Sequence, residues 1–506
     1  MAHDPPRRAI RRLEDFLSGR DRPGSKRPGD TARPTLTARR GGEEARRGIR
    51  GGAPQPPAGL AARLLAGDIV GEVLDARRPL DEVLSEILAS GRGLALAPRD
   101  RGLARLIAAT VIRRTAAIDA LLAEFLEKPL GDRHAAARNI LRIAAAQMLY
   151  LETPAHAAIN LAVAHCRRHP ATGRFDKLAN AVLRKVVMQG RALLEDIDQV
   201  RLAVPDFMWR GWVAAYGEET ARRIAEASLV EAPLDLSLKE PASAADWAGR
   251  LEGVALASGT VRLTAGGRVE DRKGYDEGAW WVQDAAAALP ARLFGADPAA
   301  SLAGLSAVDL CAAPGGKTMQ LAARGARTVA VDLSASRIER IAENLARLGL
   351  AAELVTADAG EWRPDRTFDC VLLDAPCTAT GTIRRHPDIL HLKRADDLKR
   401  LVPVQARLLA AAANLVSPGG ELVYATCSLE PEEGVRQVEA FLAANPAFER
   451  HAVAAGTGGI APEWVTPEGD LRTLPFHNPT HLDPTGDPER RGMDGFFAAR
   501  LRRRQT

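Results

Sequence analysis

Two cysteines lie in settings that could make a thiol react. Cys377 ends residues 374–377 (DAPC), and Cys427 lies within residues 424–428 (YATCS). A single buried cysteine usually only fills a core, but a thiol beside a carboxylate can attack an electron-poor ring while the acid exchanges a proton. Because both cysteines follow apolar runs and one stands near an acid, we interpret the pair as functional.

A glycine-rich run, residues 309–318 (DLCAAPGGKT), precedes both cysteines. Its last three residues are like the end of a P-loop, but that motif needs a glycine five residues before its second glycine, where Cys311 stands. A phosphate cradle is therefore disfavoured. A turn that opens a helix still presents backbone amides, which suit the carboxylate of a methionine-derived cofactor. The alternative is a plain connection between a strand and a helix.

Three aspartates complete the candidate site. Asp332 ends an apolar run, where an acid binds ribose hydroxyls in dinucleotide-like folds, although capping of the next helix is an equal alternative. Asp358 could reach an adenine amine or simply be solvated. Asp374 could hydrogen-bond a ring nitrogen of a base and share a proton with it. Residues 384–388 (RRHPD) could hold phosphates, although such a charge run is usually only solvated surface.

These groups together predict methylation of a pyrimidine carbon. Carbon 5 of cytosine is a poor nucleophile, but addition of a thiolate at carbon 6 turns the ring into an enamine-like nucleophile that accepts a methyl group. The thiolate must later be expelled, and a second thiol with an acid can assist that release. The base must also leave its stack to reach the thiol, which favours RNA loops or transiently opened RNA.

The elements that would position these side chains alternate from about residue 307. We expect strands at 308–310, 329–332, 353–355, 368–374, 421–426 and 495–501, and helices at 316–324, 334–348 and 395–416. Apolar runs that alternate with helices predict a parallel sheet covered on both faces. Ligands of such sheets bind outside the carboxyl ends of the strands. Cys311, Asp332, Asp358, Asp374 and Cys427 fall at or just after those ends, which predicts one composite site.

The chain upstream predicts further domains. Residues 1–57 are rich in Arg, Pro and Gly, and we expect a disordered basic tail. Residues 58–198 carry helical periodicity and predict an all-α domain of six or seven helices. Residues 199–295 predict a small α+β linker that binds RNA, with helices at 207–227 and 280–293 and strands at 234–238 and 261–264. Residues 296–506 predict the α/β catalytic domain.

The composition fits a multidomain protein, because 506 residues exceed one ordinary domain. The net charge is +5, and the first 50 residues hold 14 Lys and Arg against 7 Asp and Glu, so the remaining chain is close to neutral. A basic tail can bind RNA phosphates or only aid solubility. The five cysteines show no metal or disulfide spacing; Cys166, Cys311 and Cys370 fit packing roles. We therefore expect no metal, no membrane span, a cytoplasmic location and a monomer.

The motifs resemble those of a known family. Residues 309–318, 374–389 (DAPCTATGTIRRHPDI) and 424–434 (YATCSLEPEEG) resemble the Sun/RsmB/NOP family of RNA 5-methylcytosine methyltransferases. Upstream, residues 154–160 (PAHAAIN) and 178–184 (LANAVLR) look like a NusB-type RNA-binding domain. That combination is typical of the RsmB branch, which methylates a cytosine in small-subunit ribosomal RNA.

The resemblance implies a fold, a cofactor and roles for residues. It implies a NusB-like all-α domain before a Rossmann-like class I methyltransferase domain, with S-adenosylmethionine as cofactor. Cys427 would be the nucleophile, Cys377 the thiol that aids product release, and Asp374 the residue that contacts the base. The implied cofactor residues are Cys311, Ala312, Ala313, Pro314, Gly315, Gly316, Lys317, Asp332, Asp358 and Asp374.

Three alternatives remain open. The same reaction on transfer RNA or another RNA is the nearest, because the helical domain favours ribosomal RNA without proving it. A DNA cytosine methyltransferase is less favoured, since those enzymes place the nucleophile at Pro-Cys and lack the Thr-Cys partner. An RNA-binding or antitermination factor with an idle methyltransferase domain is disfavoured by the intact pair of Cys377 and Cys427.

Overall fold

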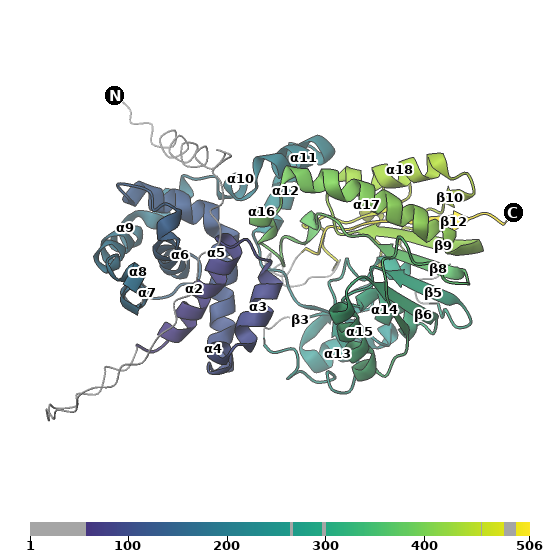
Figure 1. The fold of residues 1–506 in the computed structure, drawn as a ribbon, viewed down its shortest axis with the longest axis horizontal. Helices are drawn as coiled ribbons and strands as arrows, with labels where there is room; N and C mark the ends of the chain where they lie inside the picture. The colour runs from purple at the N-terminus through teal and green to yellow at the C-terminus, as the bar shows by residue number, and fades with distance from the viewer. Residues whose placement is uncertain are drawn as a thin grey trace, which may run out of the picture. The chain divides into compact units, whose positions relative to one another are not determined.

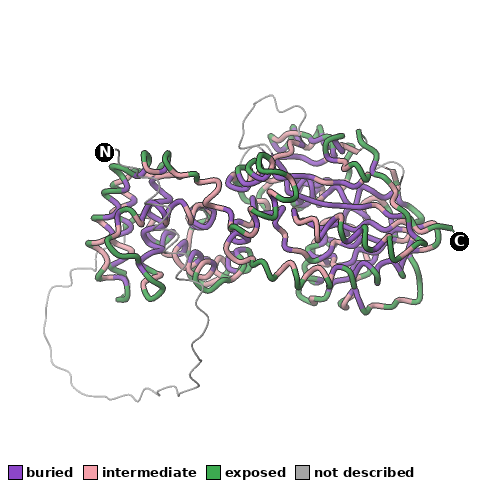
Figure 2. The backbone as a smooth tube through the Cα atoms, turned by 90° about the horizontal axis from the view of Figure 1, so that it is seen from above, coloured by how far each residue is buried: buried purple, intermediate pink, exposed green. Residues whose placement is uncertain are grey.

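The computed structural model describes residues 57–168, 170–263, 267–295, 300–456, 458–479 and 492–505. The basic tail predicted at 1–57 lies outside them apart from its last residue. One compact unit of the chain runs to Gln199, and a second begins at Val200 (Figure 1). Figure 2 shows that the buried positions lie in the interior of each unit. Among the described residues, every helix is too short or too polar to cross a bilayer.

The first unit is all-α, as predicted. Its described part contains six helices of ten residues or more and two of four residues, close to the predicted six or seven. They are α2 (Leu60–Leu74), α3 (Leu80–Ala89), α4 (Gly91–Leu94), α5 (Pro98–Phe125), α6 (Ala135–Leu149), α7 (Ala155–Arg168), α8 (Pro170–Gly173) and α9 (Asp176–Glu195), followed by α10 (Gln199–Ala203), which begins at the unit's last residue.

Local sequence explains the two longest of these helices. Pro98 occupies the first turn of α5, where its missing N–H costs no hydrogen bond. In α9, Val182, Leu183 and Val186 recur at the spacing of a helix face and are buried. Between helices, Arg142 is buried against Asp119, with Nη2 2.6 Å from Oδ2.

The second unit begins with helices and a small antiparallel sheet. The helix predicted at 207–227 is two helices, α11 (Asp206–Tyr216) and α12 (Glu218–Ser228), because Gly217 between them has a φ of 80°. The sheet has the order β2-β3-β1-β4. Its strands are β1 (Asp235–Leu238), β2 (Gly253–Ala255), β3 (Thr260–Leu263) and β4 (Trp280–Val282). The helix α13 (Ala244–Leu251) connects β1 to β2.

The helix predicted at 280–293 is wrong. Trp280 and Trp281 pair with β1 as strand β4, and both indoles are buried. The alanine-rich run that follows forms turns because side chains capture its amides: Asp284 Oδ1 accepts from Ala286 N at 2.8 Å, and Asp235 Oδ2 accepts from the N–H of Ala285 at 3.1 Å. Such bonds compete with helix formation. Only a short 3₁₀ turn, Pro290–Arg292, is helical.

The main sheet carries the candidate site. Its strand order is β10-β12-β9-β8-β5-β6-β7, with β11 paired to β12. The strands are β5 (Ser306–Leu310), β6 (Arg327–Asp332), β7 (Glu353–Thr356), β8 (Phe368–Asp374), β9 (Val416–Thr426), β10 (Phe448–Arg450), β11 (Leu471–Arg472) and β12 (Phe497–Arg503). The predicted strand at 368–374 matches β8 residue for residue.

The predicted parallel pairing holds for the core of the sheet but not for its last strands. The pairs β5–β6, β6–β7, β5–β8 and β8–β9 are parallel, but β12 runs antiparallel to β9, β10 and β11. The last strand returns beside β9 with Phe497 opposite Thr426. Strand direction is set by this pairing, which the apolar pattern of a single strand does not encode.

Both faces of the sheet are covered, as predicted. The helices are α14 (Gly316–Ala323), α15 (Ala335–Leu348), the one-turn α16 (Ile389–Leu392), α17 (Ala395–Asn414) and α18 (Val435–Ala444). Figure 1 shows α17 and α18 on one side of the sheet and α14 and α15 on the other. Side chains alternate along β6, so that Val329 and Val331 belong to the buried cluster that contains Leu409 of α17, whereas Ala330 belongs to the one that contains Ile341 of α15.

Candidate active site

Three neighbouring strands end at one edge of the main sheet. Asp374, the last residue of β8, pairs with Ala425, two residues before Cys427. Leu310 ends β5 beside β8, and Cys311 follows it. The parallel core of the sheet therefore brings these three segments to the same carboxyl edge, where ligands of such sheets bind.

The two thiols meet at this edge. Cys377 Sγ lies 3.4 Å from Cys427 Sγ, and both residues are half-buried. The hydrogen bond between the thiols, then burial, raises the pKa of Cys377 well above its ordinary value. Cys377 therefore keeps its proton and can share it with the Cys427 sulfur.

Lys317 joins the site through Asp374. Its Nζ donates to Asp374 Oδ2 at 2.6 Å and lies 5.1 Å from the ring centre of Phe496. Burial alone would lower the pKa of Lys317, but the carboxylates of Asp374 and Asp309 raise it above its ordinary value. Lys317 is thus a buried ammonium next to Asp374, the residue that we predict from the sequence to contact the base.

The glycine-rich turn depends on two glycines and a buried acid. Gly315 has a φ of 100°, and a Cβ there would lie 3.1 Å from Ile341 Cγ1. A Cβ on Gly316, where α14 begins, would lie 3.1 Å from Gln283 Nε2. Below the turn, Asp309 Oδ2 accepts from Thr318 Oγ1 at 2.6 Å. Burial raises the pKa of Asp309 to about 7.

Cys311 and Asp332 support the turn. Burial, with the nearby Asp374 and Asp332, raises the pKa of the Cys311 thiol to about 12, so it stays neutral, and its side chain packs against the core. Asp332 is almost fully buried; its carboxylate accepts from the backbone N–H groups of Ala313 and Ser334, each at 3.1 Å. The residues from Ala312 to Pro314 complete the turn, with Ala312 N donating to a β6 carbonyl at 3.0 Å.

Asp358 lies beyond the adjacent strand β7. Its Oδ1 accepts from Gly360 N at 2.7 Å, and its Oδ2 lies 3.1 Å from Arg407 Nη2. The bonds to Arg407 and Gly360 lower the pKa of Asp358 below its ordinary value. Leu333, which directly follows Asp332 in the chain, is 73% exposed. The edge thus combines the ionised carboxylate of Asp358 with an exposed apolar side chain.

The first residue of the charged run at 384–388 does not belong to a solvated surface. Arg384 is buried, and Arg385 Nε donates to Asp494 Oδ2 at 2.9 Å. Burial raises the pKa of Asp494 to about 6, although Arg385 opposes the shift.

Four residues that contact this region were not predicted from the sequence: Phe496 lies against Lys317, and Asp494 accepts from Arg385. Glu433 accepts from Thr378 N, and Gln405 donates to the carbonyl of Pro376. No signal in the sequence marks Asp494, because it precedes the predicted strand at 495–501, and only the antiparallel direction of β12 brings the start of that strand to the carboxyl end of β9.

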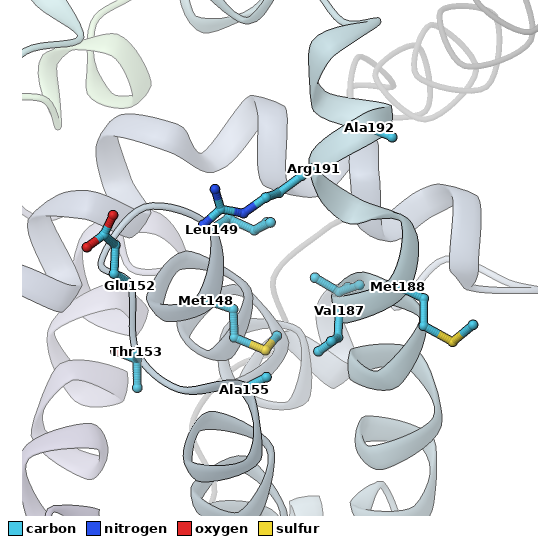
Figure 3. Close-up of a pocket in the computed structure, with 10 residues that line it drawn as sticks. Met148, Leu149, Glu152, Thr153, Ala155, Val187, Met188, Arg191 and Ala192 are labelled. Carbon is cyan, nitrogen blue, oxygen red and sulfur yellow. The ribbon is translucent and has the colours of Figure 1, made fainter.

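A separate hollow lies on the first unit. It has a volume of about 560 Å³ and is lined by Met148 of α6, Val187, Met188 and Arg191 of α9, and the turn at Glu152 (Figure 3). The residues around it are those drawn in Figure 3 and include none of the predicted site residues. Across the described residues, no three His, Cys, Asp or Glu side chains are grouped as a metal ion would need.

Two family models match the chain, one in each of its two units. The family model described as 16S rRNA methyltransferase RsmB/F matches residues 303–502, and the NusB family model matches residues 60–188. The crystal structure of PH0851, at 22% identity and a TM-score of 0.68, covers 88% of this chain and 98% of its own, and so shows the same fold.

Two curated relatives bear the name ribosomal RNA small subunit methyltransferase B. The protein from Xanthomonas campestris pv. campestris is 36% identical over 429 residues, which cover 79% of this chain and 93% of the relative. That from Pseudomonas syringae pv. tomato is 34% identical over 456 residues, which cover 87% and 96%. The chain therefore belongs to the RsmB family of S-adenosylmethionine-dependent ribosomal RNA methyltransferases.

Proposed function

We propose that the protein methylates carbon 5 of a cytosine in small-subunit ribosomal RNA, with Cys427 forming a transient covalent bond to carbon 6. The observation that carries this proposal is the 3.4 Å separation of the Cys377 and Cys427 sulfurs, at the same sheet edge as the Lys317–Asp374 pair. The names of the relatives support the ribosomal substrate.

Cys427 begins the reaction. Its thiolate forms a C–S bond to carbon 6, and ring electrons shift toward carbon 5 and the ring nitrogen, which makes carbon 5 nucleophilic. Asp374 contacts that nitrogen and relays to it a proton from the Lys317 ammonium bonded to Asp374 Oδ2, which neutralises the negative charge that the ring has gained. The proton returns to Lys317 by the same route after the methyl group has been added.

S-adenosylmethionine supplies an electrophilic methyl group when bound. We propose that residues 311–317 hold it together with Asp332, Asp358 and Asp374. Two features fit this ligand. The α14 N-terminus at Gly316 presents amides to a carboxylate, and the exposed Leu333 offers an apolar surface to an adenine ring.

Cys377 assists product release. Loss of the carbon 5 proton to water restores the aromatic ring and breaks the C–S bond, so Cys427 leaves as a thiolate. Because the pKa of Cys377 is raised, its thiol still carries a proton and donates a hydrogen bond to the departing sulfur. This donation stabilises the leaving group.

The test is transfer of labelled methyl from S-adenosylmethionine to fractionated cellular RNA, followed by nucleoside analysis. We expect label as 5-methylcytosine in small-subunit RNA, and none with Cys427→Ala. Cys166→Ala is the matched control, because Cys166 lies in α7 of the other unit. Label in transfer RNA would overturn the substrate, and methylation by Cys427→Ala would overturn the nucleophile.

A further inference from the structure

Glu433 is a completely buried carboxylate next to the site. It lies in the 3₁₀ turn Pro431–Glu433 between β9 and α18, and its relative exposure is 0%. Its Oε1 accepts from Thr378 N at 3.0 Å and from Gln405 Nε2 at 2.9 Å. Its Oε2 accepts from the Thr378 hydroxyl. Burial of a carboxylate is costly unless hydrogen bonds compensate, and here these neutral donors provide them.

These hydrogen bonds fix the residues on both sides of Cys377. Thr378, which follows Cys377, gives Glu433 its backbone N–H and its hydroxyl. Gln405, buried on α17, bonds Glu433 and also donates to the carbonyl of Pro376 at 2.9 Å. The residues before and after Cys377 are thus tied to one point, which limits where the thiol can lie.

The main chain of the same residue fixes the partner segment. Glu433 O accepts from the Tyr424 hydroxyl at 2.8 Å and from Thr426 Oγ1 at 3.3 Å, and Thr426 directly precedes Cys427. The side chain of Glu433 therefore orders the Cys377 segment, and its carbonyl orders the end of β9. A substitution of the side chain disturbs only the first of these.

We propose that Glu433 is the positioning residue that holds the Cys377 thiol beside Cys427. This role rests on the proposed function, in which Cys377 aids release of the product. In Glu433→Gln, one oxygen becomes an NH₂ group that faces the donors of Thr378 and Gln405, so the Cys377 segment loosens while Cys427 stays in place.

The first experiment measures the thiol pair without RNA or cofactor. Phenylarsine oxide bridges two adjacent thiols, exchanging its oxygen, lost as water, for two As–S bonds. We expect the full-length protein to bind it, Cys377→Ser to lose the bridged binding, and Glu433→Gln to bind at least tenfold more weakly at an unchanged Tm. Glu432→Gln is the matched control, because the neighbouring Glu432 pairs with Arg436 on the surface.

The second experiment measures turnover. We expect Glu433→Gln to accumulate a covalent protein–RNA complex on denaturing gels, as Cys377→Ser should, with kcat lowered roughly ten- to hundredfold and the KM for S-adenosylmethionine unchanged. A displaced Cys377 thiol would lower kcat alone, whereas general damage to the fold would change both kcat and the KM for S-adenosylmethionine.

Each outcome decides the proposal. Wild-type arsenical binding and turnover in Glu433→Gln would overturn it, as would failure of the wild-type protein to bind the arsenical. If Glu433→Gln lowers the Tm, Gln405→Ala decides, because it removes the ties to Pro376 and Glu433 and must weaken arsenical binding. If arsenical binding falls as expected while wild-type protein forms no 5-methylcytosine, the positioning role stands and the proposed reaction fails.

Discussion

The ammonium of Lys317 is bonded to Asp374 across 57 residues of chain, with Nζ 2.6 Å from Oδ2. Lys317 belongs to the glycine-rich turn, which we assign to the cofactor, but its charged end reaches the acid on the neighbouring strand. The two residues thus join the turn after β5 to the end of β8. We infer that Lys317 acts mainly on the base.

Lys317→Met should separate these two roles. Because the ammonium stabilises charge on the ring rather than the cofactor, we expect kcat to fall by roughly a hundredfold or more. The Kd for S-adenosylmethionine should change by less than about tenfold, or about 1.4 kcal/mol. Methyl-transfer kinetics and calorimetric titration measure the two quantities.

The control for this variant is Lys399→Met. Lys399 is an exposed lysine of α17 that pairs with Asp396 one turn away, and such pairs contribute little. Both quantities should match the wild type in this control. If Lys317→Met weakened cofactor binding by as large a factor as it lowered kcat, Lys317 would act on cofactor binding and not mainly on the base.

Asp309→Asn should change how stability depends on pH. Burial raises the pKa of Asp309 to about 7, whereas an aspartate of the unfolded chain titrates near about 4. Between these values the unfolded chain releases a proton that the folded protein keeps. Stability therefore falls as pH rises through this window, by at most about 1.4 kcal/mol per pH unit.

The asparagine carries no such proton and can still accept from Thr318. Relative to the wild type, Asp309→Asn should become steadily more stable from about pH 4 to about pH 7 and then level off. Urea unfolding across this range measures the difference in free energy. A difference that stays constant with pH would show that Asp309 is ionised in the folded protein.

The sequence predicts the catalytic sheet well where local pattern determines the structure. Continuous apolar runs such as residues 368–374 mark buried strands, and an acid or cysteine at their ends marks the functional edge. The boundaries are predicted less well, since β9 begins at Val416, five residues before the predicted start at 421. The prediction of a helix at 280–293 was wrong because two backbone N–H groups there are hydrogen-bonded to side chains. Ala285 N donates to the distant Asp235, and Ala286 N donates to Asp284.

Long-range pairing explains what the sequence could not predict. The antiparallel direction of β12 depends on its partner β9, and the bond from Lys317 to Asp374 depends on how two strands pair. Glu433 gives no local signal either, since it reads as one acid among several in a surface-like run until the fold buries it against Thr378.

Gly315→Ala should destabilise the protein through two effects. The residue has a φ of 100°, a left-handed conformation that costs an L-residue roughly 1–2 kcal/mol. Its Cβ would also lie 3.1 Å from Ile341 Cγ1. Gly349→Ala is the matched control, because Gly349 is left-handed too, at a φ of 61°, but the nearest atom to its Cβ would be a flexible lysine end at 3.8 Å.

Chemical unfolding of both glycine variants separates strain from crowding. Gly349→Ala reports the conformational cost, and the extra loss in Gly315→Ala reports the contact with Ile341. We also expect weaker S-adenosylmethionine binding only in Gly315→Ala, because only that glycine lies in the turn. Equal losses of stability in the two variants would mean that α15 moves to admit the methyl group.

Arg385→Met should make stability more sensitive to pH. Burial raises the pKa of Asp494 to about 6, and the Arg385 guanidinium holds it down. Without Arg385 the pKa of Asp494 rises further, so the folded protein keeps a proton that the unfolded chain loses above about pH 4. The variant should therefore lose more stability relative to the wild type at about pH 8 than at about pH 5.

Arg436→Met is the control, because the Arg436–Glu432 pair is largely exposed and its removal should cost little at either pH. An equal loss for Arg385→Met at both pH values would mean that Arg385 does not lower the pKa of Asp494, which would contradict the prediction.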